Sequence, residues 1–374
     1  MHKHLLYHGF EQGPIRPPSE ARSLLLRITR NCPWNRCTFC PLYKQSTFSI
    51  RPIEHVKKDI DKIHEYIQRL TKHPYAKESI DLFGSDHIAF LSAKRWMANG
   101  LESIFLQDSN SLARDPQELI IILEYIKKQL PTVKRITSYA RSSTIHKMTL
   151  DSLINIKKAG LNRIHIGLES GSDQVLKLVC KGATKQIHIN AGKKVKAAGI
   201  ELSEYVMPGL GGQHLSKIHA LETADAINQI NPKFIRLRPL ALPLDIAKNP
   251  PFSLKDFKKC TDQQIVKELH LFISNLDGIN STLLSDHILN LFSDLQGTFP
   301  QNKEKMITLL EIFSNLPKDQ QYLYQLGRRM GVFSTLEDMQ NKLLFAQVKL
   351  YAEQMKKMNK NIDEVTDELM QYYI

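Results

Sequence analysis

Six short apolar runs alternate with helix-period segments between residues 20 and 240, and this alternation most constrains the fold of the chain. Strands that are separated by helices pair in parallel, so the pattern predicts an α/β fold built from repeated βα units. The predicted strands are Leu24–Ile28, Ser103–Leu106, Val133–Thr137, Asn162–Gly167, Glu201–Val206 and Phe234–Leu237.

The helices between these strands carry their own start and stop signals. Asp115 followed by Pro116 is typical of a helix N-terminus, while Gly160 and Gly199 each follow a Lys-rich last turn and lead into a strand. The same ending used twice indicates consecutive units of one barrel. An apolar stripe predicts a helix directly after the first strand and its loop, at Ile53, Val56, Ile60, Ile63, Ile67 and Leu70.

The strand signal stops near Pro250, and helix-period segments take over. We therefore expect an N-terminal extension at 1–19, a core at 20–245 and a helical C-terminal domain at 250–374. Residues 71–101 are predicted to be an insertion within the core.

Composition excludes several classes of protein. The sequence has no apolar run long enough to span a membrane and no signal peptide, and its five cysteines do not form a secreted disulfide framework. We expect a cytoplasmic protein with no membrane partner. The formal charge of +13 leaves a nucleic-acid partner open, but the lysines are scattered and the solvated-surface interpretation is favoured.

Cys32, Cys37 and Cys40 follow the first predicted strand in a Cys-x4-Cys-x2-Cys pattern. This spacing lets three thiolates converge on one metal centre or cluster. A zinc site is the alternative, although the next His, His55, is distant in sequence and a closed zinc site needs a fourth ligand. Three thiolates on a four-iron cluster would leave one iron open to a further ligand.

The cysteine loop, with Phe39 just before Cys40, resembles the radical S-adenosylmethionine (radical SAM) superfamily. The commonest spacing in that superfamily is one residue shorter between the first two cysteines. The resemblance covers roughly residues 20 to 240, and it implies a partial (β/α)6 TIM-like barrel with the helical C-terminal domain appended. It also implies a [4Fe-4S] cluster on Cys32, Cys37 and Cys40, with SAM bound to the open iron.

The resemblance further implies that polar residues at the strand ends contact SAM, because the loops after the strands meet at one end of such a barrel. Gln107 and Asp108 stand where the family has a glycine-rich turn that holds the SAM amino group, and Arg141 is placed to pair with the SAM carboxylate. Similar enzymes contact the ribose near Glu169 and adenine after the fifth strand. The predicted cofactor-binding residues are Phe39, Gln107, Asp108, Ser109, Asn110, Ser138, Arg141, Glu169, Ser170, Ser203 and Met207.

By the same resemblance, the protein is a radical SAM enzyme that cleaves SAM to a 5′-deoxyadenosyl radical and abstracts hydrogen from an unidentified substrate. Arg236 and Arg238 suggest an acidic substrate, and a flavodoxin or ferredoxin is the expected electron donor. The likeness to oxygen-independent coproporphyrinogen oxidase is general, because Leu42 and Gln107 replace residues typical of that enzyme.

Two alternatives stay open at this stage: a non-catalytic carrier of cluster, SAM or heme, and a radical SAM enzyme that modifies RNA. The carrier hypothesis would use a histidine such as His165 or His287 as an axial ligand. The remaining cysteines, Cys180 and Cys260, are predicted to lie in helices as small core residues.

Overall fold

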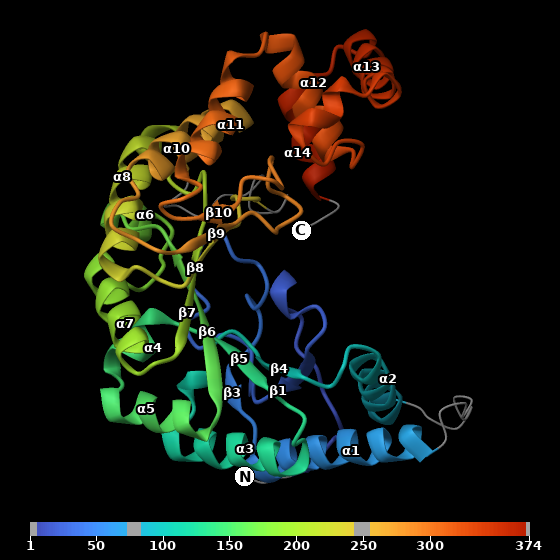
Figure 1. The fold of residues 1–374 in the computed structure, drawn as a ribbon, viewed down its shortest axis with the longest axis vertical. Helices are drawn as coiled ribbons and strands as arrows, with labels where there is room; N and C mark the ends of the chain where they lie inside the picture. The colour runs from blue at the N-terminus through green and yellow to red at the C-terminus, as the bar shows by residue number, and fades with distance from the viewer. Residues whose placement is uncertain (1–5, 73–83, 243–254, 372–374) are drawn as a thin grey trace. The chain divides into compact units, whose positions relative to one another are not determined.

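The computed structural model describes residues 6–72, 84–242 and 255–371 (Figure 1). Part of the predicted insertion, 73–83, and the predicted end of the core at 245 lie outside these residues. The contacts group the chain into two compact units. The first comprises Met1–Asn35, Leu42–Ile166 and Ala191–Leu202, and the second comprises Arg36–Pro41, Gly167–Asn190 and Ser203–Ile374.

The strands confirm the predicted α/β class. One sheet has the order β1-β4-β5-β6-β7-β8-β9-β10, and β6 and β7 pass from one unit into the other. Its first six strands overlap the six predicted runs and are joined by helices. The neighbouring strands from β1 to β6 and from β7 to β9 pair in parallel. Their bounds are β1 Leu24–Arg27, β4 Ser103–Gln107, β5 Arg135–Ala140, β6 Leu161–Glu169, β7 Glu201–Val206, β8 Phe234–Leu237, β9 Thr282–Leu284 and β10 Gly297–Thr298.

In the first unit, helices pack beside the parallel strands and bury the expected apolar stripes. Val56, Ile60 and Ile63 of α1 are fully or almost fully buried, as their spacing predicts. Asp115 caps α3 by accepting hydrogen bonds from the backbone N–H groups of Gln117 and Glu118. The helices are α1 Ile53–Lys72, α2 Gly84–Ala98, α3 Pro116–Gln129, α4 Ser142–Lys147, α5 Leu150–Ala159 and α7 Lys185–Ala197, the last starting in the second unit; β2 Thr29–Arg30 and β3 Ser49–Ile50 pair as a small separate sheet.

The second unit contains the helices of the C-terminal region. Thr261 and Gln264 form a reciprocal capping box at the start of α10. Tyr324 of α12 stacks between Phe292 and Phe333 and anchors an aromatic core. The helices are α6 Asp173–Leu178, α8 Gly212–Ile230, α10 Asp262–Ser274, α11 Lys303–Asn315, α12 Lys318–Arg329, α13 Lys342–Lys357 and α14 Ile362–Met370.

Two expectations about the later part of the chain are wrong. The strand signal does not end at Pro250, because β9 pairs with β8 and β10 pairs with β9. These strands are too short to carry a period, so the pairing partner determines them. Cys180 and Cys260 do not lie in helices: Cys180 follows α6 with a positive φ of 52°, and Cys260 precedes α10.

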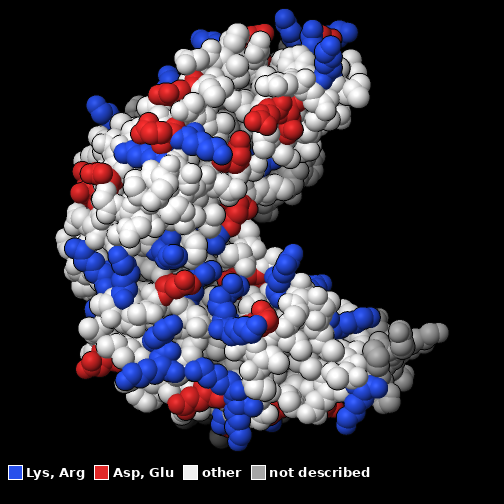
Figure 2. All heavy atoms as spheres, viewed as in Figure 1, with Lys and Arg blue, Asp and Glu red and all other residues white. Residues whose placement is uncertain are grey.

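Among the described residues, no helix has the length and apolar character needed to cross a membrane. On the face of the molecule in Figure 2, Lys and Arg side chains are interspersed with Asp and Glu.

Candidate functional site

The cysteine loop connects β2 to β3, directly after β1. None of the five cysteines is disulfide-bonded. Cys32 belongs to the first unit, whereas Cys37 and Cys40 belong to the second. Within the described residues, no group of three His, Cys, Asp or Glu side chains is preassembled to hold a single metal ion.

Cys32 lies in surroundings that favour a thiolate. Burial alone would raise the pKa of Cys32, but hydrogen bonds from the backbone at Asn35 and Trp34, together with the charge of Arg141, lower the pKa below its usual value. The Asn35 N–H lies 3.5 Å from the Cys32 sulfur. A thiolate is the form that binds metal, so the donor chemistry suits an iron–sulfur cluster.

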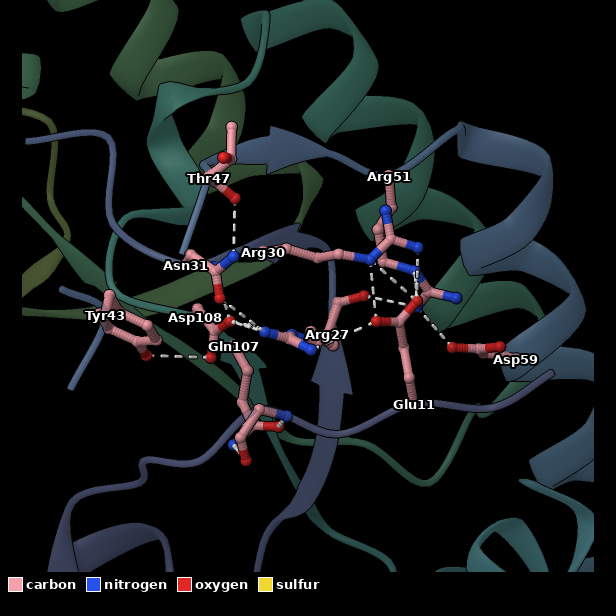
Figure 3. Close-up of polar contacts among 11 residues, drawn as sticks. Glu11, Arg27, Arg30, Asn31, Tyr43, Thr47, Arg51, Asp59, Gln107 and Asp108 are labelled. Carbon is pink, nitrogen blue, oxygen red and sulfur yellow. Dashed lines mark hydrogen bonds and ion pairs between the residues drawn. The ribbon is translucent and has the colours of Figure 1, made fainter. Parts of the chain in front are cut away.

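Gln107 and Asp108, at the end of β4, are fully buried and engaged inside the first unit (Figure 3). The Gln107 side chain accepts a hydrogen bond from the Gly13 N–H at 2.9 Å and donates to the Ile15 carbonyl at 2.7 Å. The Asp108 carboxylate accepts two hydrogen bonds from the Arg27 guanidinium, at 2.7 and 2.8 Å. Both predicted cofactor residues therefore have extensive protein partners.

Ser109, Asn110 and Arg141 connect the loops after β4 and β5. The backbone N–H of Arg141 donates to Asn110 Oδ1 at 3.1 Å, and the Arg141 guanidinium lies over the Trp34 ring, 5.3 Å from its centroid. Arg141 is therefore held beside the cysteine loop, near Cys32. Ser138, earlier on β5, is fully buried and donates to the carbonyl of Tyr139.

In the second unit, the segment with Cys37 and Cys40 is fastened to the end of α6. The Thr38 N–H donates to the Val179 carbonyl at 3.0 Å, and the Cys40 N–H donates to the Cys37 carbonyl at 3.3 Å. Phe39, between the two cysteines, packs against an apolar cluster formed by Val175, Val179, Met207, Leu210 and Leu240. Phe39 and Met207, both predicted to contact the cofactor, thus belong to one apolar surface.

Glu169 pairs with a lysine that also meets this surface. Its Oε1 pairs with the Lys181 ammonium at 3.0 Å, and Lys181 also lies 5.9 Å from the centroid of the Phe39 ring. Glu169 ends β6 with a φ of 62°, which turns its side chain out of the strand direction. A Cβ at Gly167 would lie 2.1 Å from Glu169 Oε1, so a glycine is needed there to leave space for the carboxylate.

Ser170 and Ser203 have partners within the second unit. The Ser170 hydroxyl hydrogen-bonds His219 Nδ1 at 2.8 Å, and the Ser203 hydroxyl accepts from Arg236 Nε at 3.2 Å. Arg236 is buried and pairs with Asp286. Arg238, in contrast, is exposed at the end of β8, so it is the better candidate for an acidic ligand.

Glu204 is a candidate that sequence reasoning missed. This β7 residue is fully buried, and neither carboxylate oxygen has a hydrogen-bond partner among the described residues. Burial, reinforced by the charge of Glu169, raises the pKa of Glu204 well above its usual value. A second Glu in the middle of the predicted strand Glu201–Val206 was the available signal, because burying a carboxyl without a partner is costly.

Comparison with known proteins places these observations in a family. The model of the radical SAM superfamily matches residues 26–224, just over half of the chain. The 4′-phospho-dehydrooxetanocin synthase of Priestia megaterium is 29% identical in an alignment of 221 positions that covers 55% of this chain and 26% of that protein. The chain thus spans about a quarter of the length of this curated relative.

Solved structures resemble the chain at low sequence identity. Coproporphyrinogen III oxidase (HemN) from Escherichia coli is 15% identical with a TM-score of 0.46, covering 68% of this chain and 52% of that chain. Methylornithine synthase (PylB) is 15% identical with a TM-score of 0.42, covering 79% and 82%. The cobalamin-dependent radical enzyme OxsB is 19% identical with a TM-score of 0.40, covering 95% and 47%.

Proposed function

Because the chain belongs to the radical SAM superfamily, we propose that this enzyme binds a [4Fe-4S] cluster through Cys32, Cys37 and Cys40 and cleaves SAM reductively. The single observation that carries the proposal is the family match across the cysteine loop and the strand ends that follow it. The donor set supports it, since these cysteines are not disulfide-bonded and the pKa of Cys32 is lowered.

The chemistry comes from the cofactors. A reduced cluster with SAM supplies a 5′-deoxyadenosyl radical that removes hydrogen from an unactivated carbon. The protein binds and orients the cofactors and excludes water from them, and different residues are proposed for these roles. Arg141, whose guanidinium lies over the Trp34 ring, is proposed to pair with the SAM carboxylate.

The second unit contributes the remaining proposed contacts. Glu169, held by Lys181, is assigned to the ribose side of SAM, while Phe39 and Met207 provide an apolar surface for the adenosyl group. Five further polar residues remain proposed as contacts to SAM or as supports of the residues that contact it: Ser109, Asn110, Ser138, Ser170 and Ser203. Glu204 joins them, because a bound hydroxyl or amino group would give its unpartnered carboxyl a hydrogen-bond partner.

The substrate is proposed to be acidic. Arg238 is the exposed cation at the end of β8, whereas Arg236 is already paired with Asp286. The name of the curated relative specifies a phosphorylated product, which agrees with this substrate class. Radical SAM enzymes also need a reductant, and a flavodoxin or ferredoxin is proposed for that role.

The decisive experiment is anaerobic. The protein is reconstituted with iron and sulfide, dithionite and SAM are added, and 5′-deoxyadenosine is measured by chromatography. We expect 5′-deoxyadenosine from the wild type and from Cys180→Ala, and none from Cys32→Ala, Cys37→Ala or Cys40→Ala. Cleavage by Cys37→Ala would contradict the ligand assignment.

A further inference from the structure

The buried Asp108 carboxylate lies between the two ends of the cysteine loop, and this position gives it a use beyond cofactor contact (Figure 3). Its Oδ2 accepts from the backbone N–H of Asn31, the residue before Cys32, at 3.0 Å. Its Oδ1 accepts from the hydroxyl of Tyr43, three residues after Cys40, at 3.3 Å. One carboxylate thus contacts both flanks of the loop within the first unit.

The two flanks are held in further ways. Arg27 donates to Asp108 through both Nε and Nη2, and its Nη2 also lies 3.3 Å from Asn31 Oδ1. The Ser109 hydroxyl donates to the Asn31 carbonyl at 3.0 Å. Asn31 itself has a positive φ of 67°, which is uncommon for a residue other than glycine. The hydrogen bonds from Arg27 and Ser109 hold Asn31 in this conformation and so set the direction in which the backbone enters Cys32.

The N-terminal segment covers the same carboxylate. Gln107 holds the backbone at Gly13 and Ile15, and a Cβ at Gly13 would lie 1.9 Å from Asp108 Oδ1. Glu11 fastens the segment further by pairing with Arg30 at 2.6 Å and with the buried Arg51 at 2.8 Å. The predicted extension is therefore packed directly against Asp108.

We propose that Asp108, with Arg27, Asn31, Tyr43 and Gln107, forms a loop brace that positions the cysteine loop for the cluster, and that residues 11–15 press this brace into place. Asp108 is thus a positioning residue that acts through the loop. This inference rests on the proposed function, because it presumes that the loop holds a cluster. It assigns to the N-terminal segment a role in retaining iron.

The test uses the reconstituted full chain and two variants of the brace. Asp108→Asn keeps the shape but loses the charge that pairs with Arg27, and Gly13→Ala pushes a methyl group against the carboxylate without a strained φ. Three quantities are measured: the rate of iron release to a ferrous chelator, the electron paramagnetic resonance spectrum of the reduced cluster, and the dissociation constant for SAM.

We expect both variants to release iron about tenfold faster and to show an altered cluster spectrum, because residues that orient metal ligands commonly change metal affinity by this amount. Glu201→Gln is the matched control: it removes the charge that pairs with Arg163 elsewhere in the first unit and should change neither quantity. Tyr43→Phe, which removes only one contact, is the milder variant if Asp108→Asn does not fold, and it should accelerate iron release less.

Two results would overturn the brace. The first is that Gly13→Ala and Tyr43→Phe release iron at the wild-type rate and show the wild-type spectrum. The second is that Asp108→Asn binds SAM more weakly but releases iron at the wild-type rate, because this result would indicate that Asp108 contacts the cofactor directly. A wild-type protein that takes up no cluster would instead defeat the proposed function, so the two failures are distinguishable.

Discussion

Replacing Gly167 by alanine tests the role of Glu169 without altering that residue. A Cβ at position 167 would lie 2.1 Å from Glu169 Oε1 and 3.0 Å from the Lys181 ammonium, far closer than carbon approaches oxygen in proteins. Gly167 does not have a positive φ, so its backbone accepts alanine. The new methyl group must therefore displace the Glu169 carboxylate by about 1 Å, an error that can cost about 100-fold at a reacting site.

We expect the dissociation constant for SAM to rise by about 10- to 100-fold, equivalent to about 1.4 to 2.7 kcal/mol of binding free energy. The assay is equilibrium titration of SAM into the anaerobically reconstituted protein, with iron and sulfide content measured on the same sample. Iron content should equal that of the wild type, because Cys37 and Cys40 are not changed.

Gly278→Ala is the matched control in the same unit. Gly278 has a φ of +65° and nothing within 4 Å of an added Cβ, so alanine there strains only the backbone. It should lower the free energy of unfolding by about 1 kcal/mol and leave SAM affinity alone. An unchanged dissociation constant in Gly167→Ala, with the protein folded and the cluster loaded, would remove Glu169 from the proposed SAM site.

Two further predictions concern stability. Arg51 and Asp59 form an almost fully buried ion pair at 2.6 Å. Arg51→Met leaves Asp59 without its cation, so it should lower the free energy of unfolding, measured by urea titration, by about 3 to 5 kcal/mol. A loss of under about 1 kcal/mol would show that the pair is not buried in solution. Glu204→Gln should raise stability at neutral pH in the absence of ligand, because the amide has no charge that burial disfavours. The sign follows from the raised pKa of Glu204: its neutral form is favoured in the folded state, so this contribution is complete below the unfolded pKa of about 4.3 and is lost as the pH rises through the folded pKa. The wild type should therefore lose stability relative to the variant as the pH rises above about 4.3, the pKa of a Glu in the unfolded chain, and parallel pH profiles of the two proteins would disprove it.

Local sequence signals predicted much of the fold because they act over a few residues. The apolar stripe of α1, the Asp115 cap and the terminal Gly160 and Gly199 are satisfied by hydrogen bonds and burial along one helix, so they can be read without a tertiary partner. The strands before Pro250 could be predicted for the same reason. Strands β9 and β10 could not be predicted, since they are too short for a period and form only where β9 pairs with β8 and β10 pairs with β9.

The candidate site divides in the same way. The sequence by itself determined which residues carry the chemistry: three cysteines in one loop, and a polar residue after each strand of an α/β sheet. Only the tertiary structure decided how they are used. Asp108 meets Asn31 and Tyr43, Lys181 meets Glu169, and Glu204 is left unpartnered, because segments distant in the chain set the burial and the partners of each charge. A residue's type is local information, whereas its electrostatic surroundings belong to the folded chain.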